Sequence, residues 1–410
     1  MVKIARFIYT NYFLFLSINA ILVIIVQKVA IYEYIIFPST CLLLAFVYRP
    51  QYLKVNILDI LFICSLIWLC ITWSCNSYEN QGILILRCIM SQGAFMSVYL
   101  LGRNKHFDSY IFFQKCPKPL LICCILGVLF FINPPNWYIE RAYNDYEVNQ
   151  YNMLEIFRLK SVFPSPYHIS YMCGFTTIYI WFSFIYSKSI NKENIVYFFS
   201  FIITMLLTMM RAPFLSVMLA IIAGIIYMSI YYKSHKILFN VFFFCGLLYI
   251  IGLILAPILD LEQMEYLIQK IDTVTSKSDE LIDNRLDLGF SYGLIGDGAG
   301  RHAIYAYKYG QEGILDSEYV KLLVEQGYVG LAILVLLIIV AIWKCIKYFK
   351  SLALELSIIL FFVLTMIGAD SLSTADKHCF IFWVTIGRVS AFSPKGCCKF
   401  GNLNLNPNLL

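Results

Sequence analysis

The chain has 410 residues, of which 60% are hydrophobic and 14% are charged, and its formal net charge is +6. A soluble domain is about 45–50% apolar and about 25% charged, so this chain has too few charges to keep its surface in water. The composition therefore excludes a soluble enzyme, a nucleic-acid-binding module and a disordered scaffold. Lipid is the expected solvent for most of the protein.

Apolar runs long enough to cross a membrane recur along the chain. A transmembrane helix needs about 20 mostly apolar residues to cross a hydrocarbon core of about 30 Å. This requirement predicts an all-α, polytopic integral membrane protein with about twelve transmembrane helices. The predicted spans are residues 7–27, 31–48, 57–74, 82–101, 119–133, 167–187, 194–210, 212–232, 237–259, 318–342, 352–369 and 377–392. The first run is too long for a cleaved signal peptide, so we expect a retained signal anchor.

The basic residues alternate between the connections of these spans. If the N-terminus is cytoplasmic, 18 Lys and Arg residues fall in the inner segments, and only Lys28, Arg211 and Lys377 fall in the short outer turns. Because Lys and Arg accumulate on the cytoplasmic side of a membrane protein, both termini are predicted to lie inside.

Two long connections are predicted on the outer face of a single transmembrane domain that covers residues 1–410. The first loop spans 134–166 and the second spans 260–317, which contains many of the acidic residues. Loops of this length in a compact protein are usually functional or disordered. The second loop opens with an amphipathic pattern over 264–271, which predicts a helix on the membrane surface. The tail 402–410 is expected to be disordered.

The main ionisable residues within the predicted spans are Glu33, Asp59 and Arg87. Charge inside a membrane costs several kcal/mol and usually marks function. Glu33 and Asp59 lie within about one turn of a span end, so their side chains are expected to snorkel to the interface. Arg87 lies about five residues inside the outer end of its span, from which its guanidinium reaches either the headgroups or a ligand phosphate.

Three further arginines are predicted on the outer face. Arg158 precedes the segment LKSVFPSP, Arg211 lies in the tight turn TMMRAPFL, and Arg285 opens NRLDLGFSYGLIGDGAG. Each arginine alone is explained by contact with headgroups or solvent. Three on one face favour an anionic ligand, because the planar guanidinium binds phosphate oxygens bidentately.

The second loop also contains a glycine-rich turn, with Gly296, Gly298 and Gly300. A dinucleotide-binding fingerprint requires a βαβ unit around such glycines, and none is predicted here, so the turn indicates flexibility instead.

The loop ends at Asp316, Ser317 and Glu318, immediately before the tenth span. Either of the first two is a suitable helix N-cap. A polar cap at the mouth of a lipid-facing cavity is also a candidate site. His168 and His302 form no HxxxH pair or Cys/His cluster, so we expect a site without a metal and without a cofactor.

At these residues the chain resembles the O-antigen polymerase and ligase superfamily of bacterial inner-membrane proteins. IGDGAG followed by DSEYVKLLVEQGYVGLAIL is similar to the family's glycine turn, polar cap and late apolar helix. Ten residues separate Arg285 from Gly296, as in the Arg-x10-Gly element of the polymerases. Two departures stand out. Ile169 occupies the corresponding glycine position after Arg158, and Asp316 and Ser317 replace the His-Asn pair of the ligases, which favours a polymerase.

The resemblance implies a fold, an activity and roles for the candidate residues. It implies a GT-C-like architecture with two periplasmic loops and the polymerisation of undecaprenyl-diphosphate-linked repeat units into O antigen, capsule or exopolysaccharide. The implied partners are lipid-linked donor and acceptor glycans, membrane lipids, and a chain-length regulator and flippase of the same pathway. The expected catalytic residues are Arg211, Arg285, Asp316 and Glu318, and the expected substrate contacts are Arg87, Arg158, Gly296, Gly298, His302 and Tyr319.

Two alternatives remain open at the level of sequence. A ligase would transfer finished polymer from its lipid carrier. A flippase or transporter of lipid-linked glycans would place the same arginines along a pathway and would need charges deep in the membrane.

Overall fold

We describe the fold from a computed structural model of the chain. The structure describes residues 1–26, 32–48, 55–74, 96, 98–104, 107–142, 158–163, 165–186, 191–208, 210–232, 246, 293–296, 298–299, 317–369, 372 and 378–392. The secondary structure of these residues is helical. The elements are α1 (Val2–Thr10), α2 (Tyr12–Val26), the π-helix η1 (Tyr32–Ile36), α3 (Phe37–Val47), α4 (Ile57–Ser74), α7 (Val98–Arg103), α8 (Ile111–Lys115), α9 (Pro117–Ile132), α10 (Asn136–Ala142), α12 (Pro166–Tyr186), α13 (Lys192–Leu207), α14 (Arg211–Tyr232), α17 (Glu318–Lys347), α18 (Phe349–Gly368) and α19 (Cys379–Ala391).

Three helices within the described residues, α4, α17 and α18, are long and apolar enough to span a membrane. A fourth span would be formed by Val2–Thr10 together with Tyr12–Ile25, which meet at a bend of 76°. The structure therefore confirms a helical protein with membrane-spanning character. The count of twelve spans stays a prediction, and most of the fourth predicted span and all but residue 246 of the ninth lie outside the described residues.

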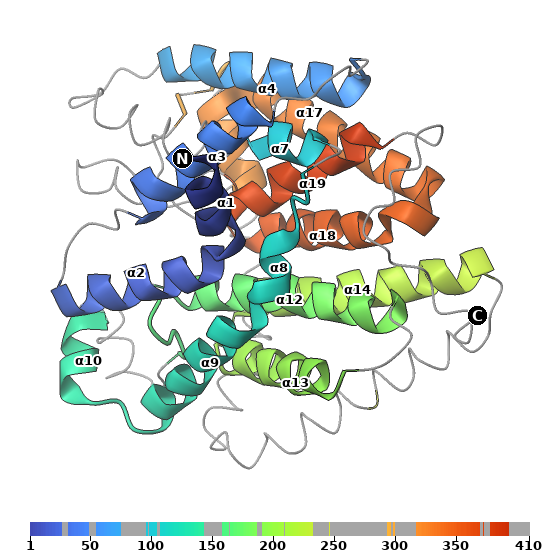
Figure 1. The fold of residues 1–410 in the computed structure, drawn as a ribbon. Helices are drawn as coiled ribbons and strands as arrows, with labels where there is room; N and C mark the ends of the chain where they lie inside the picture. The colour runs from blue at the N-terminus through green and yellow to red at the C-terminus, as the bar shows by residue number, and fades with distance from the viewer. Residues whose placement is uncertain are drawn as a thin grey trace, which may run out of the picture.

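The long helices lie side by side in a row (Figure 1). The row begins with α4 at one edge, continues through α17, α19 and α18, and reaches α12, α14 and α13 at the other. Neighbours in the row are in contact, as for α4 with α17, α17 with α18, α18 with α14, and α14 with α12. The shorter helices α1, α3, α8 and α9 cross one side of this row.

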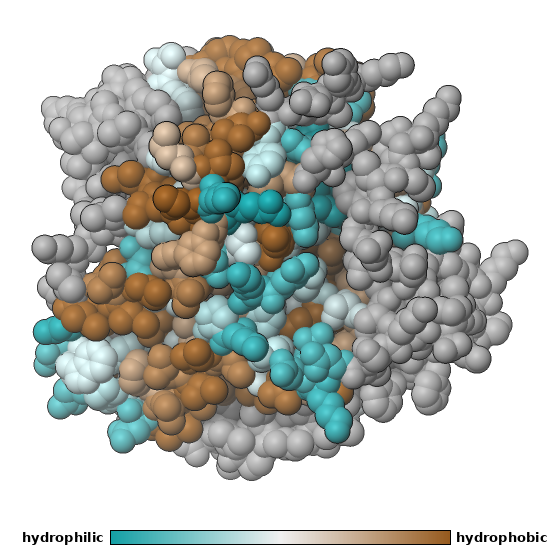
Figure 2. All heavy atoms as spheres, in the orientation of Figure 1, coloured by the Kyte–Doolittle hydropathy of each residue, from teal (hydrophilic) through white to brown (hydrophobic). Residues whose placement is uncertain are grey.

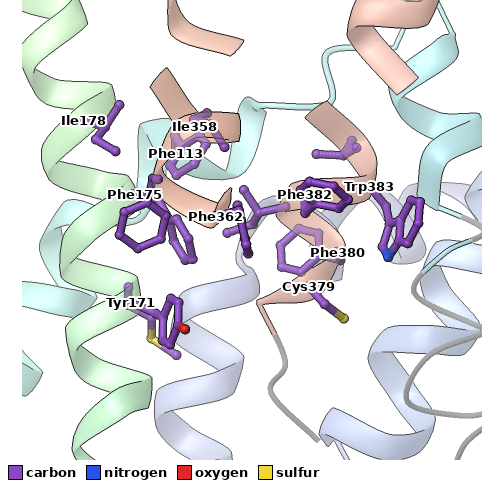
Figure 3. Packing of buried hydrophobic residues seen from close by; sticks show 14 of the residues in the cluster. Phe113, Tyr171, Phe175, Ile178, Ile358, Phe362, Cys379, Phe380, Phe382 and Trp383 are labelled. Carbon is purple, nitrogen blue, oxygen red and sulfur yellow. The ribbon is translucent and has the colours of Figure 1, made fainter. Parts of the chain in front are cut away.

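Aromatic side chains fill the space between α12, α18 and α19 (Figure 3). Phe362 of α18 contacts Phe175 of α12 and Phe382 of α19, and both pairs of ring centroids are 5.4 Å apart. Each such pair contributes about 0.5–1.5 kcal/mol beyond the area that it buries. The three helices therefore share one core, which holds their ends in fixed relative positions.

Helices α7 and α19 approach each other at two glycines. A Cβ atom at Gly102 would lie 2.0 Å from the carbonyl oxygen of Val384, and one at Gly387 would lie 2.1 Å from that of Tyr99. Small residues at such crossings allow backbones to pack closely, as is common between helices in membranes.

Large apolar side chains cover much of the surface on the face shown in Figure 2. On α4, Ile60, Ile63 and Ile67 are each about half exposed (53%, 50% and 55%). An exposed apolar surface of this kind marks a membrane or partner interface, in agreement with the composition of the chain.

The helices have two polar ends, which we name after one residue in each. At the Glu318 end, α12, α14, α17 and α19 begin, and α13 and α18 end. At the Arg388 end, α4 and α18 begin, and α17 and α19 end. The charge distribution of the sequence predicts that the Glu318 end lies outside the membrane and the Arg388 end inside.

Candidate functional site

The Glu318 end is tied together by bonds between helix termini. Ser317 donates from Oγ to the carbonyl oxygen of Met366 at 3.2 Å, which joins the start of α17 to the end of α18. His168 of α12 and His378, which precedes α19, have ring centroids 5.3 Å apart. The structure therefore brings four helix termini together where the sequence predicts the outer face.

Helix α17 is broken near this end. Gly327 has φ 68° and ψ −171°, which are not helical values, and it divides the helix into a short first segment and a longer second one. A break frees backbone N–H and C=O groups that must find other partners. The glycine turn of the second loop supplies them.

The glycine turn lies against the break. Tyr328 donates its backbone N–H to the carbonyl oxygen of Gly293 at 3.2 Å, and Gly298 donates its N–H to the carbonyl oxygen of Glu325 at 3.0 Å. Gly296 and Gly298 have φ values of 77° and 108°, a region that favours glycine. A Cβ at Gly296 would lie 2.5 Å from the backbone nitrogen of Gly327. The two predicted glycines therefore fix the second loop to α17.

Glu318 is fully buried at the start of α17. Its Oε2 accepts a hydrogen bond of 2.8 Å from the backbone N–H of Leu372, in the segment between α18 and α19. The next residue, Tyr319, donates its hydroxyl to the carbonyl oxygen of Val363 in α18 at 3.0 Å. Ser317 occupies the N-cap position, but its side chain makes no capping hydrogen bond. The first turn is therefore held by bonds to α18 and its following segment.

Two further charged residues of the first segment, Lys321 and Glu325, have no exposed surface. Their spacing from Glu318, three and seven residues, places all three side chains on one helical face. Sequence reasoning did not single out Lys321 or Glu325. The sequence does contain a pattern that could have identified them, because charged residues recur at helical spacing at the start of an otherwise apolar span.

The segment before α12 is also anchored at this end. Leu159 donates its backbone N–H to the carbonyl oxygen of Leu207, the last residue of α13, at 3.2 Å. Lys160 is 1% exposed, whereas Arg158 is partly exposed. The end of the first loop thus contributes a second buried lysine, which the sequence did not indicate.

An apolar cavity adjoins the broken helix. It has a volume of about 50 Å³ and is open on one side. Residues of α4, α17 and α19 form its walls, among them Trp68, Glu318, Gln326 and Trp383. Trp68 donates its indole N–H to the carbonyl oxygen of Gln326 at 2.9 Å, so α4 is joined to the break itself.

Several predicted site residues cannot be placed. Arg87, Arg285, His302 and Asp316 lie outside the described residues. Arg211 begins α14, at the Glu318 end as predicted, but its side chain lies outside the description. Among the described residues, no group of three or more His, Cys, Asp or Glu side chains could hold a metal ion.

The Arg388 end contains a second set of buried charges. Arg388 pairs with Glu355 at 3.1 Å and lies over the ring of Tyr110, 4.0 Å from its centroid. Asp59 pairs with Arg103 and accepts a hydrogen bond of 2.5 Å from the hydroxyl of Tyr99. These contacts join α4, α7, α18 and α19.

The expectation that Asp59 snorkels to the interface is wrong. The residue is 4% exposed, and its carboxylate also accepts a hydrogen bond of 3.0 Å from Oγ of Ser390. A carboxylate with a cation and two hydroxyl donors has no need of water, because these groups replace its hydration. The side chain of Glu33, for which the same expectation was made, lies outside the description.

Comparison with protein-family models and with curated proteins finds no match for this chain. The likeness to the polymerase and ligase superfamily therefore rests on the order and spacing of the residues named above.

Proposed function

We propose that this protein is a membrane glycosyltransferase that polymerises undecaprenyl-diphosphate-linked oligosaccharide repeat units at the periplasmic face of the bacterial inner membrane. It would do so as a polytopic protein of about twelve spans with both termini in the cytoplasm. The observation that carries the proposal is the broken start of α17, where the glycine turn and the buried Glu318 meet beside a cavity. In the sequence, this is the region of greatest resemblance to the superfamily.

The proposed reaction joins two lipid-linked glycans. A hydroxyl of the acceptor attacks the anomeric carbon of the donor, a new C–O bond forms, and the bond from that carbon to undecaprenyl diphosphate breaks. The diphosphate leaves with the bonding electrons, and the hydroxyl proton passes to a base. Glu318, or Asp316 beside it in the sequence, is our choice of base, a role typically worth 10²–10⁴-fold in rate.

The arginines of the outer loops would stabilise the leaving group. Negative charge grows on the diphosphate as the bond breaks, and fixed cationic donors at a site of low dielectric stabilise it strongly. Arg211 and Arg285 are assigned to this clamp, and Arg158 or Arg87 to the second diphosphate. The buried Lys160 and Lys321 add positive charge at the same end of the molecule.

A flippase is the second candidate, and one observation favours it. The sequence offered few charges deep within the spans, but the structure buries Lys321 and Glu325 inside the first segment of α17. Buried charges of this kind also occur along transport pathways.

A strain that lacks the gene distinguishes the candidates. For a polymerase we expect surface glycan of a single repeat unit and the loss of long chains. Loss of all surface glycan would indicate a flippase, and polymer retained on its lipid carrier would indicate a ligase. Complementation with the intact gene should restore long chains in the first case.

A further inference from the structure

The cavity beside the break in α17 contains polar groups that nothing in the described structure satisfies. The side-chain amide of Gln326, which is 91% buried, makes no hydrogen bond to any described residue. Trp383 is 5% exposed, and its indole N–H also has no partner among these residues. Both side chains line the cavity. Neither group is among the fully buried polar atoms that lack a partner, so both are accessible at the cavity wall, where they can bond to water or to a ligand.

The two tryptophans differ in what they can offer. Trp68 has its N–H committed to the backbone of Gln326 at 2.9 Å, so it presents only its ring to the cavity. Trp383 packs against Phe382 with ring centroids 5.2 Å apart, and its indole N–H is not committed to a described residue. Trp68 therefore offers the cavity only an aromatic face, whereas Trp383 can also donate a hydrogen bond from its indole N–H.

The third polar group that lines this cavity is the carboxylate of Glu318, a fully buried residue. The ligand must therefore suit an amide, an N–H donor, a carboxylate and aromatic faces. A hydrocarbon chain would leave the amide and the indole N–H without partners. A phosphate would meet the carboxylate, which repels it. A sugar edge suits all four, because its C–H face packs on indole rings and its hydroxyls both donate and accept.

We propose that this cavity binds one edge of a pyranose ring. A volume of about 50 Å³ holds roughly four water-sized spheres, enough for a hydroxymethyl group or two ring hydroxyls, with the rest of the ring at the open side. If the protein is the proposed polymerase, this ring is the terminal sugar of the acceptor, with its attacking hydroxyl toward Glu318. That last assignment rests on the proposed function, but the sugar site does not.

The test measures sugar binding to the full chain in lipid nanodiscs. The probes are methyl glycosides of common hexoses, 6-deoxyhexoses and N-acetylhexosamines, detected by saturation-transfer-difference NMR. Ser65→Phe places a ring in the cavity from α4, since Ser65 lines it. Ile63→Phe adds the same ring at a position of α4 that is 50% exposed and does not line the cavity.

We expect at least one glycoside to bind the wild-type protein and Ile63→Phe, and none to bind Ser65→Phe. Gln326→Leu should weaken that glycoside roughly 3- to 10-fold, the loss of one or two neutral hydrogen bonds. This second variant keeps the test valid if Ser65→Phe does not fold. Absence of binding by every glycoside, or equal binding to all four proteins, would overturn the proposal.

The outcome is separate from that of the gene-deletion test. If the protein binds a sugar at the cavity but deletion of its gene leaves chain length unchanged, the sugar site is supported and the polymerase function is refuted. If deletion abolishes long chains but no sugar binds at the cavity, the polymerase function is supported and the sugar site is refuted. Binding of farnesol, and of no glycoside, would assign the cavity to a hydrocarbon chain and overturn the sugar site.

Discussion

Three charged residues at the start of α17 are buried in an apolar helix, where the burial of a charge costs free energy. Glu318, Lys321 and Glu325 have no exposed surface, although the helix that they open is apolar over most of its length. Ionisable groups in such positions are usually paired and functional. Three such side chains on one helical face are more than the fold of a short segment requires, so we assign them to the site.

Glu318→Gln tests the proposed base. The glutamine keeps an oxygen that accepts the N–H of Leu372, so the protein should fold and reach the membrane at a normal level. It cannot take a proton from an attacking hydroxyl, and polymer formation by the purified protein on lipid-linked repeat units should fall by about 10²-fold or more. The matched control is Glu193→Gln, at an exposed position of α13, which should keep full activity. Wild-type rates in Glu318→Gln would remove Glu318 from the mechanism.

Arg285 tests the proposed diphosphate clamp. Arg285→Ala and Arg211→Ala should each abolish long chains at normal protein level. Arg285→Lys should restore them only in part, because an ammonium keeps the charge but cannot bind two phosphate oxygens in a planar fork. Chain length is read on gels of surface glycan. Normal chain length in both alanine variants would contradict the clamp, and full activity of the lysine variant would contradict bidentate contact.

Some residue-scale features could be predicted and others could not. Gly296, Gly298 and Glu318 were singled out in the sequence because glycine turns and polar caps have local signatures, and their roles in a site stay a prediction. The partners of Asp59 could not be found, since Arg103 and Ser390 are distant in the chain and only the packing of α4 with α7 and α19 brings them together.

At the scale of elements, α17 is two segments joined by a turn of the chain. The backbone oxygens and N–H groups freed at Gly327 bond to Gly293, Leu294 and Gly298 instead of to one another. The second loop therefore holds the first segment, with Glu318 on it, at a fixed angle to the second. We regard this break as the element that sets the geometry of the site.

Gly327→Ala tests the role of the break. A Cβ would lie 2.3 Å from the carbonyl oxygen of Leu294, and the φ of 68° is strained for alanine. The substitution should destabilise the protein by more than the 1–3 kcal/mol of backbone strain alone and should abolish activity. Thermal unfolding in detergent measures the first effect and the polymer assay the second.

Two glycines serve as controls for that substitution. Gly293 has a comparable φ of 70°, but no atom lies within 4 Å of the Cβ that alanine would add. Gly293→Ala should therefore show the backbone strain without a steric clash. Gly246→Ala has open space around the new Cβ and should be close to neutral. Equal effects in Gly293→Ala and Gly327→Ala would mean that the close contact with the loop is unimportant.

Sequence located the helices better than it located their interruptions. The predicted span 57–74 coincides with α4, and the predicted start at residue 318 coincides with that of α17. The predicted span that begins at residue 318 runs through Gly327 without a boundary, and apolar residues likewise continue through the 76° bend after Thr10. Composition averaged over a window cannot register either feature, because both depend on contacts with other elements.

At the scale of the whole molecule, the two polar ends differ in kind. The Glu318 end has an open cavity and a loop docked on a broken helix. At the Arg388 end, the pairs Glu355 with Arg388 and Asp59 with Arg103 connect four helices. Breaking a buried pair of this kind costs about 3–5 kcal/mol, so these contacts favour a fixed end. A polymerase that works on one face needs no opening there, whereas a flippase does.

A crosslink at the Arg388 end separates these two mechanisms. Asn56 before α4 donates from Nδ2 to Oγ of Ser390 in α19 at 2.9 Å, so cysteines at both positions should be close enough to be joined by a short thiol crosslinker. We expect the joined Asn56→Cys, Ser390→Cys protein to make long chains at the wild-type rate, because the proposed chemistry takes place at the opposite end. The measurement is polymer formation before and after crosslinking, on reconstituted protein.

The two single-cysteine variants, treated in the same way, account for reaction at the native thiols. A protein that must open at this end to admit its substrate would lose its activity only in the double variant and regain it when a cleavable crosslinker is cut. That result would assign the buried charges of α17 to a pathway across the membrane and would replace the polymerase by a flippase. Retained activity in the crosslinked protein would instead confine substrate handling to the Glu318 end, where the cavity and the broken helix lie.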